Sequence, residues 1–299
     1  MRLLLSIIAI IFLFSCGSSD HKTQGGSLLH LIEDNMHGTI SVVRGDDTAA
    51  ILTQNAKEGI RPYIHPLVAP DGQGVLTEFS PSHHKHQTGL YWGLKEVNGR
   101  DYFMNWKEEY WKRVSAEVLN EKGIEVKWRI VYDLLGDKSN SILTETQTWS
   151  FTESEGKYLL DLIWEGEAHT DVTMGKFYVG GLFVRMPWHA GIAGEVINSA
   201  GQRNAGGEGQ RAIWSDIGIQ VPGRQDRGHI AILDHPDNVG FPSPWRVDNE
   251  LGVGPSRQIL GDWTIKAGET HVIRYRIVVY TGPHDGRMIG RIWKNYVCR

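Results

Sequence analysis

Short segments in which apolar and polar residues alternate occur along most of the chain after residue 27. The alternation is clearest at 115–119, 123–132, 143–151 and 158–167. A period of two is typical of antiparallel strands with one buried and one solvent-facing side. Turn-forming sequences such as Asn98-Gly99 separate the runs, and no helix longer than about three turns is predicted. The chain is therefore predicted to be all-β, a large antiparallel β-sandwich. Further β-type runs are 39–44, 49–53, 60–68, 75–79, 88–94, 178–186, 212–219, 229–234 and 271–280.

The N-terminus has the features of a bacterial lipoprotein leader. Arg2 precedes an apolar run at 3–14, which is shorter than the roughly 20 residues that span a bilayer. Cys16 follows at a position suited to lipidation, and 17–26 is polar and flexible. An ordinary signal peptide with a chance cysteine, or an uncleaved anchor, stays open as the alternative. We predict a lipoprotein signal peptide (1–15), a lipidated tether (16–27) and a single β-sandwich domain (28–299), which the lipid alone holds at the periplasmic or outer-membrane face of the cell envelope.

Composition excludes several classes of function. The chain has 299 residues, 40% of them hydrophobic, and a net charge of -4, which argues against a nucleic-acid partner. No phosphate-binding loop and no zinc-type cysteine pair is present in the sequence. The two cysteines favour neither thiol catalysis nor a cysteine-ligated metal site. No cofactor is predicted.

Three of the thirteen histidines, His83, His84 and His86, lie between a Pro/Ser turn and a β-type run. His84 and His86 are two residues apart, so on extended backbone their imidazoles face the same side. Such a pair supplies part of a metal site or the groups for proton transfer. Exposed loop histidines satisfied by backbone carbonyls are the alternative, and for metal binding alone that alternative is favoured. The candidates to complete such a site are His65, Glu78, His189, His229 and His235.

Three other segments carry candidate chemistry. Arg185 ends a β-type run and is suited to holding a carboxylate or a carbonyl oxygen, with a surface ion pair as the alternative. Asp234 and His235 end another run as a pair for proton transfer, or Asp234 caps a turn. Trp245-Arg246 follows a proline-rich stretch and is suited to forming an aromatic wall, with a place in the core of the sandwich as the alternative for the tryptophan.

The sequence also resembles a family of secreted bacterial proteins labelled "methane oxygenase PmoA". In the histidine segment, His84 and His86 match the family pattern, whereas His83, Gln87 and Thr88 replace its aspartate, second adjacent histidine and arginine. The resemblance implies a galactose-mutarotase-like supersandwich, with a sugar on a concave sheet and His and carboxylate groups as acid and base. The matching segments are 61–67, 70–72, 77–78, 83–93, 97–99, 211–214, 232–238, 244–247, 254–255 and 261–263.

We therefore expect an envelope lipoprotein that acts on a carbohydrate by acid/base chemistry, namely hydrolysis, elimination or epimerisation. The ligand would be a small molecule or an oligosaccharide. Two alternatives are a non-catalytic glycan-binding lipoprotein with Trp92, Trp188 and Trp245 as platforms, and a metal-dependent oxygenase as the family label suggests. The predicted catalytic residues are His84, His86, Arg185, Asp234 and His235, and the predicted substrate-binding residues are His65, Glu78, Trp92, His189, Trp245 and Arg246.

Overall fold

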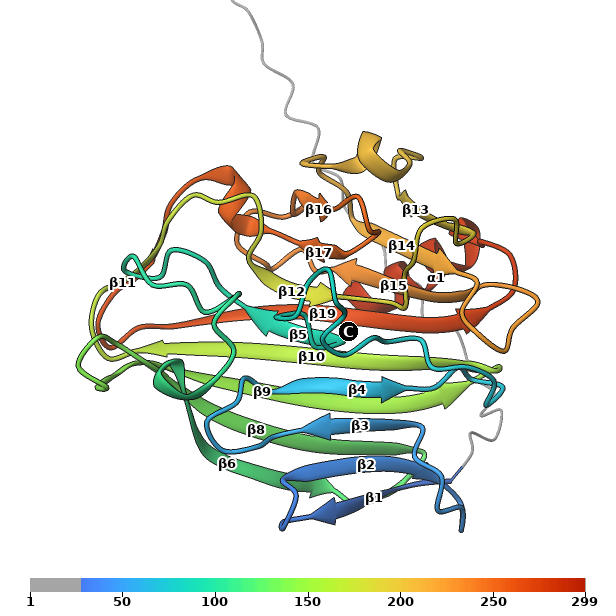
Figure 1. Ribbon diagram of the computed structural model, residues 1–299, viewed down its shortest axis with the longest axis horizontal. Coiled ribbons are helices and arrows are strands. Elements are labelled where there is room, and N and C mark those ends of the chain that lie inside the picture. The colour runs from blue at the N-terminus through green and yellow to red at the C-terminus, as the bar shows by residue number, and fades with distance from the viewer. Residues whose placement is uncertain (1–27, 299) are drawn as a thin grey trace, which may run out of the picture.

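The computed structural model describes residues 28–298, in which two large antiparallel sheets pack face to face (Figure 1). The first sheet has nine strands within this range, in the order β16 (Trp245–Val247), β17 (Val253–Pro255), β12 (Gly181–Val184), β5 (Leu90–Gly93), β4 (Tyr63–Leu67), β3 (Leu52–Asn55), β2 (Thr39–Arg44), β1 (Leu29–Asp34) and β7 (Lys122–Gly123). The second has eight, in the order β13 (Gly194–Asn198), β14 (Trp214–Ile219), β15 (Gly228–Asp234), β19 (Thr270–Thr281), β10 (Lys157–Ala168), β9 (Ser141–Ser154), β8 (Glu125–Leu135) and β6 (Trp111–Asn120). A small pair, β11 (Val172–Met174) and β18 (Trp263–Ile265), lies at one end.

The alternation in the sequence places one face of each strand in the core. In β8, Val126, Trp128 and Ile130 are buried while the residues between them are partly exposed. The same pattern runs through β9, which pairs with β8, and β10, which pairs with β9 along most of its length. Apolar side chains from both sheets form one core, in which the rings of Trp92 and Trp164 stack 4.6 Å apart. The predicted all-β antiparallel sandwich is confirmed.

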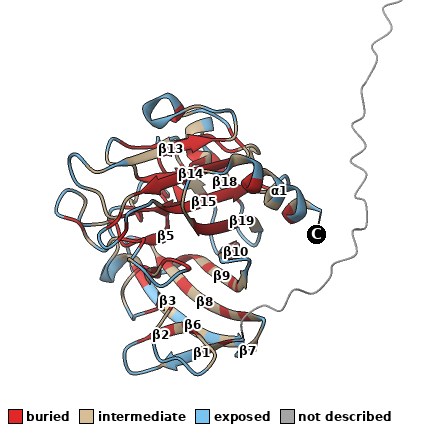
Figure 2. Cartoon of the chain, turned by 90° about the vertical axis from the view of Figure 1, so that its right-hand side faces the viewer, coloured by how far each residue is buried: buried red, intermediate tan, exposed pale blue. Residues whose placement is uncertain are grey.

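The two outer faces are covered differently (Figure 2). On the first sheet, Tyr91 and Phe183 point away from the core and pack in a smaller apolar cluster. On the second sheet, a C-terminal helix, α1 (Gly286–Val297), covers the outer side chains of β15 and β19. Asp285 caps the helix by accepting a hydrogen bond from the Met288 amide at 2.8 Å. The two outer faces are therefore separate environments on opposite sides of the core.

Some local predictions differ from the structure. Residues 75–79 form an isolated bridge at each end rather than a strand, because each end of this segment pairs with a different partner. Glu108–Tyr110 form a short 3-10 helix. The helix α1 was not predicted. Across residues 28–298, no helix is long and apolar enough to cross a membrane. The predicted signal peptide and tether (1–27), with Cys16, lie outside the described residues.

Candidate functional site

The histidine segment forms a closed loop over the outer face of the first sheet. The bridge between Phe79 and Thr88 closes its base, where the Ser80 amide donates to the Gln87 carbonyl at 2.7 Å. Gly89 follows with a φ of +87°, and a Cβ there would lie 2.5 Å from the Ile64 carbonyl oxygen. Only glycine lets the loop return this close to β4. The turn therefore fixes where the histidines stand.

The three histidine side chains are in mutual contact. The Nδ1 atoms of His83 and His84 are 2.8 Å apart, so one ring donates and the other accepts. The rings of His84 and His86 are 5.7 Å apart. Burial, together with the nearby Arg185 guanidinium, lowers the pKa of His84, and burial with Arg61 lowers the pKa of His86 to about 4. Both rings are therefore uncharged near neutral pH.

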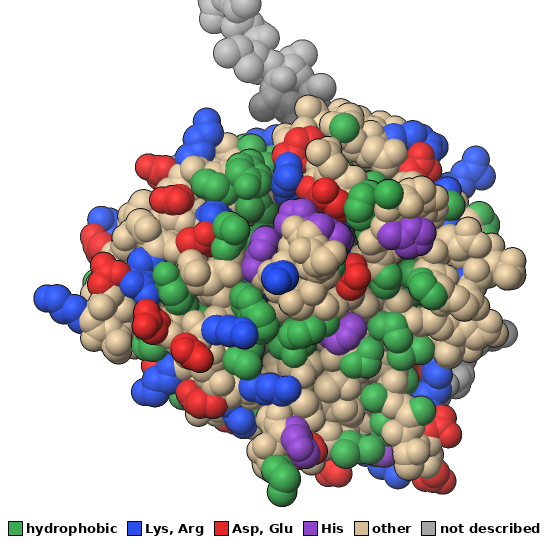
Figure 3. Space-filling model, in the orientation of Figure 1, with side chains coloured by type: hydrophobic (Ala, Val, Ile, Leu, Met, Phe, Trp, Pro, Cys, Tyr) green, Lys and Arg blue, Asp and Glu red, His purple; other side chains and the backbone are tan. Residues whose placement is uncertain are grey.

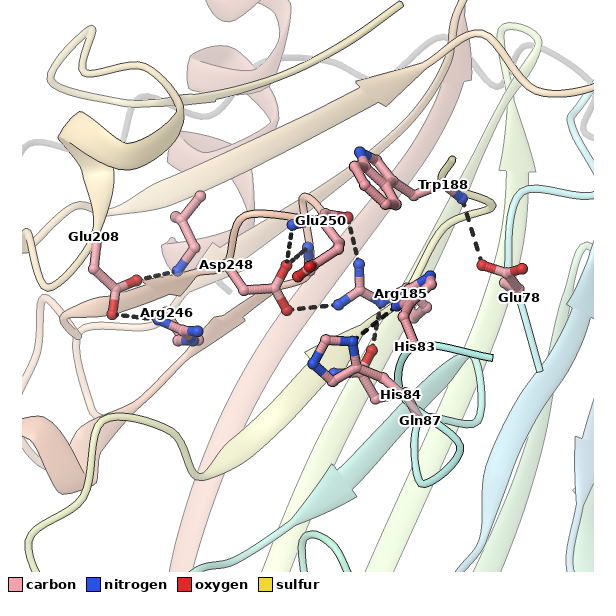
Figure 4. Close-up of polar contacts among 12 residues, drawn as sticks. Glu78, His83, His84, Gln87, Arg185, Trp188, Glu208, Arg246, Asp248 and Glu250 are labelled. Carbon is pink, nitrogen blue, oxygen red and sulfur yellow. Dashed lines mark hydrogen bonds and ion pairs between the residues drawn. The ribbon is translucent and has the colours of Figure 1, made fainter. Parts of the chain in front are cut away.

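Arg185 holds the loop to the opposite wall of the site (Figure 4). Its guanidinium is fully buried; Nε donates to the Gln87 side chain, Nη1 to the Glu250 carbonyl and Nη2 to Asp248 Oδ2 at 2.5 Å. Asp248 Oδ1 accepts from the amides of Glu250 and Gly252 at 3.0 and 2.6 Å. Every guanidinium nitrogen thus has a protein partner, so Arg185 does not serve the expected role of holding a substrate oxygen. It positions Gln87 and Asp248.

A second buried arginine, Arg61, holds the loop from below. Its guanidinium donates to the carbonyls of Phe103 at 2.5 Å and His86 at 2.7 Å, and lies 3.8 Å from the centre of the Tyr91 ring. No carboxylate pairs with it among residues 28–298. Burial lowers its pKa to about 10, which still leaves it protonated near neutral pH. An unpaired positive charge therefore lies beneath the histidine loop.

These elements surround a hollow of about 130 Å³ on the outer face of the first sheet. Figure 3 shows histidine side chains gathered near the middle of this face, beside acidic and basic ones. Arg246 stands at one wall, paired with Glu208 at 2.8 Å and stacked over the Tyr178 ring at 4.9 Å. Lys95 is bound to Asp101 at another. The hollow is lined by His84, His86, Gln87, Lys95, Phe103, Met104, Tyr178, Val179, Phe183, Arg246 and Asp248.

Of the predicted catalytic residues, the structure brings His84, His86 and Arg185 together and leaves Asp234 and His235 elsewhere. Asp234 caps the turn: Oδ1 accepts from the His235 amide at 2.9 Å, and Oδ2 from the Ser243 amide at 2.6 Å. The His235 ring instead packs against Tyr296 of α1, on the opposite face of the sandwich. The expected Asp234–His235 acid/base pair is therefore wrong, and the turn alternative describes Asp234.

The predicted substrate-binding residues are likewise divided. Trp92 and Trp245 are 1% and 0% exposed in the core, so the expectation that they offer a face to a ligand is wrong. His65 lies beside the loop, with Nδ1 3.0 Å from Thr77 Oγ1, but does not line the hollow. Glu78 accepts from the Trp188 amide at 3.4 Å, and His189 is exposed. Of the six predicted substrate-binding residues, Arg246 alone lines the hollow.

Several residues of the site were not predicted from the sequence. Asp248, Lys95, Phe103 and Tyr178 line the hollow from separate segments. His83, for which no role is predicted from the sequence, bonds directly to His84. The run of adjacent histidines is the one local feature that indicates the contact between His83 and His84. The places of Asp248, Lys95, Phe103 and Tyr178 depend on pairing between strands that are distant in the sequence.

Comparison with known proteins gives a family and weak structural likenesses. Residues 40–294 match a family model described as "Family of unknown function (DUF6807)". No curated protein matches the sequence. The fold is similar to the GH36 α-galactosidase AgaB of Geobacillus stearothermophilus (8% identity, TM-score 0.43, 84% of this chain and 41% of that chain). It is also similar to a galactose mutarotase related enzyme of Lactobacillus acidophilus (8% identity, TM-score 0.33, 84% and 97%).

This chain thus spans about two fifths of the length of that α-galactosidase. At these scores the structural likenesses carry no argument about function. Neither the family model nor these two structures bears the methane oxygenase label that the resemblance suggested.

Proposed function

We propose a function for this chain, which belongs to the DUF6807 family of unknown function, from the contacts of its own site. The hollow binds one residue of an acidic carbohydrate, and His84 removes a proton from the carbon next to the sugar carboxylate. The observation that carries the proposal is the contact of 2.8 Å between the Nδ1 atoms of His83 and His84 at a hollow that also holds Lys95 and Arg246.

The paired histidines are suited to moving a proton. His84 is partly buried and lines the hollow, whereas His83 is exposed. When the Nδ1–H of His84 donates to His83, the Nε2 atom of His84 carries a lone pair and can act as a base. A proton taken up at Nε2 allows the Nδ1 proton to pass to His83 and from there to solvent. The lowered pKa of His84 keeps the ring unprotonated and ready near neutral pH.

Charge in and beneath the hollow favours an anionic ligand. Arg246 and Lys95 line the hollow, each paired with a carboxylate outside it, and Arg61 adds a buried charge with no carboxylate partner beneath the loop. The Asp248 carboxylate is neutralised by Arg185. The rings of Tyr178 and Phe103 supply the apolar surface on which a sugar packs. The hollow is smaller than the roughly 300–1,000 Å³ of sites for drug-sized ligands, so it suits one sugar residue, free or at the end of a chain.

Elimination or epimerisation fits this equipment better than hydrolysis. Most glycosidases use two carboxylates on either side of the bond. Among the residues that line the hollow, Asp248 is the one carboxylate, and it is held by Arg185 and two backbone amides. Proton removal beside a carboxylate instead requires one base and nearby cations that stabilise the developing negative charge.

The experiment is hydrogen–deuterium exchange in deuterated buffer, followed by NMR on uronic acids and oligosaccharides that end in them. Exchange at the carbon beside the carboxylate reports epimerisation, in which solvent returns a proton to that carbon. The NMR signals of a new carbon–carbon double bond report elimination, in which the C–O bond of the neighbouring carbon breaks and the leaving oxygen is protonated by solvent. We expect exchange or the unsaturated product with the wild type, a loss in rate of at least a hundredfold in His84→Gln, and wild-type rates in His235→Gln on the opposite face. Equal rates in wild type and His84→Gln refute the assignment. Calorimetry separates binding from turnover.

A second candidate function is glycan binding without turnover, the outcome if an acidic sugar binds and no exchange occurs. The completed hydrogen bonding of Arg185 and Asp248 favours it, since it holds one wall of the hollow rigid. We also propose that the protein is a lipoprotein of the bacterial cell envelope, because Cys16 follows the apolar run at 3–14. Incorporation of labelled palmitate by the full chain, and its loss in Cys16→Ser, would test this.

A further inference from the structure

A cluster of metal-ligand side chains lies on the outer face of the second sheet, away from the hollow. Asp216 of β14 and His229 of β15 are buried, and His284 stands between β19 and α1. Asp216 Oδ2 is 3.0 Å from His229 Nδ1 and 2.7 Å from His284 Nδ1, and it accepts from the Tyr280 hydroxyl at 2.7 Å. Asp216 Oδ1 is buried with no hydrogen-bond partner among the described residues.

The hydrogen bond made by Nε2 of His229 determines whether Nδ1 of the same ring carries a proton. Nε2 lies 3.0 Å from the Gly282 carbonyl oxygen, which only accepts, so Nε2 carries a proton. In the neutral ring Nδ1 then holds a lone pair, directed at the lone pairs of Asp216 Oδ2. This contact needs a positive charge between the two atoms, either a second proton or a metal ion. A histidine that donates its other N–H to a backbone carbonyl is the usual arrangement of a metal ligand.

The distances suit a metal after a small rearrangement. Metal bonds to imidazole nitrogen and carboxylate oxygen are about 2.0–2.2 Å long. In the tetrahedral geometry usual for zinc, ligand atoms at that bond length are about 3.4 Å apart. The two Asp216–imidazole separations of 3.0 and 2.7 Å are shorter than this, so the side chains would move apart slightly to admit the ion. Two imidazoles with one carboxylate are a ligand set for zinc and other divalent transition metals, with solvent completing the coordination.

The surrounding chain is built to hold the His229 ring in place. Gly218 lies opposite His229 on β14, and a Cβ there would come within 2.2 Å of the ring atom Cε1. The other side of the ring stacks on Tyr280, with centres 4.4 Å apart. The His284 side chain remains 25% exposed, so solvent and ions reach the cluster.

We propose that Asp216, His229 and His284 bind a divalent transition-metal ion such as Zn²⁺. The ion ties β14 and β15 to the segment that leads into α1, and so holds the helix on the sheet. It lies on the face opposite the hollow and takes no part in the proposed proton transfer. Its presence or absence is therefore independent of the proposed function.

The test uses the full-length protein without a histidine tag. After chelation and dialysis, calorimetry with ZnCl₂ and metal analysis of the desalted protein measure affinity and stoichiometry. We expect one Zn²⁺ per chain, an affinity at least tenfold lower in His284→Ala, and a melting temperature several degrees higher with zinc than with chelator. His37→Ala is the matched control, because it removes an exposed His–Asp contact, also 2.7 Å long, with Asp34.

The controls make each outcome decisive. Unchanged affinity in His37→Ala, with the loss in His284→Ala, supports the site. Absence of stoichiometric zinc in the wild type, or equal affinity in His284→Ala and wild type, overturns it and leaves two protonated imidazoles around Asp216. If His284→Ala does not fold, the wild-type melting temperature with and without zinc decides, and an equal value in both refutes the proposal.

Discussion

Glu145 is a buried carboxylate whose ionisation should make the stability of the fold depend on pH. It lies on β9 in the core between the two sheets and is 1% exposed. Its Oε1 accepts from Gln147 Nε2 at 2.7 Å and its Oε2 from Trp164 Nε1 at 2.9 Å. Burial outweighs these donors and the Arg61 charge, and raises the pKa of Glu145 to about 7 from an ordinary value of 4.5.

The raised pKa of Glu145 determines the direction and the size of the pH dependence of stability. Between pH 4.5 and 7 the folded state keeps a proton on Glu145 that the unfolded chain has lost, so the free energy of unfolding falls as pH rises. The stabilisation that Glu145 provides is complete below its pKa in the unfolded chain, and it is lost above its pKa in the folded protein. A rise in the pKa of Glu145 from 4.5 to about 7 corresponds to about 3 kcal/mol of free energy of unfolding.

Glu145→Gln removes the titration and keeps the shape of the protonated side chain. One of the two donors then faces an amide NH₂, which costs about 1–3 kcal/mol at every pH. We therefore expect the free energy of unfolding of the variant, relative to the wild type, to rise by about 3 kcal/mol between pH 4.5 and pH 8. Urea denaturation at a series of pH values measures it. Glu167→Gln, on an exposed position of β10, is the matched control and should show no such change. Parallel curves for wild type and Glu145→Gln would refute the reasoning.

Three further predictions concern stability and binding. Arg185→Gln should lower the free energy of unfolding by about 3–5 kcal/mol, because it leaves the Asp248 carboxylate buried without its partner; a loss below about 1 kcal/mol in urea denaturation would contradict this. Gly218→Ala should cost about 1–3 kcal/mol, since the added methyl meets the His229 ring, and an unchanged melting temperature would disprove the clash. Trp245→Phe should destabilise the core by about 1–3 kcal/mol and leave affinity for the proposed acidic sugar within about twofold in calorimetry, whereas a large loss of affinity in a folded variant would restore Trp245 as a ligand platform.

The sequence allowed the fold class to be predicted because alternation along long strands is a local signal. In β8 to β10 each buried position is two residues from the next, and short turns join the strands. The sequence does contain a pattern that indicates helix α1: Asp285 precedes apolar residues at 288, 289, 292, 293, 296 and 297, which are spaced as on one side of a helix. This single short pattern is difficult to recognise in a chain otherwise made of strands.

The site was harder to predict, because neighbouring residues on a strand face opposite sides and the sequence does not say which side is inside. Tyr91 faces the site and Trp92 the core, so the aromatic residue expected to hold a ligand was one position out of phase. Asp234 and His235, adjacent in sequence, diverge for the same reason. Asp248 meets Arg185 across 63 residues of chain, and no local pattern announces that pairing.

Arg61 and Arg185 together show why the histidine loop is rigid. A buried guanidinium is costly unless its donors are satisfied. Arg61 donates from its two Nη atoms to backbone carbonyls, including that of His86, while its Nε has no partner among the described residues. Arg185 donates to the Gln87 side chain. Moving the loop would remove hydrogen bonds from both buried guanidinium groups. The free-energy cost of losing them keeps the loop closed. Burial lowers the pKa of His84 and His86, and the charges of Arg185 and Arg61 lower them further. The buried arginines therefore hold the imidazoles in position and also contribute to their uncharged state.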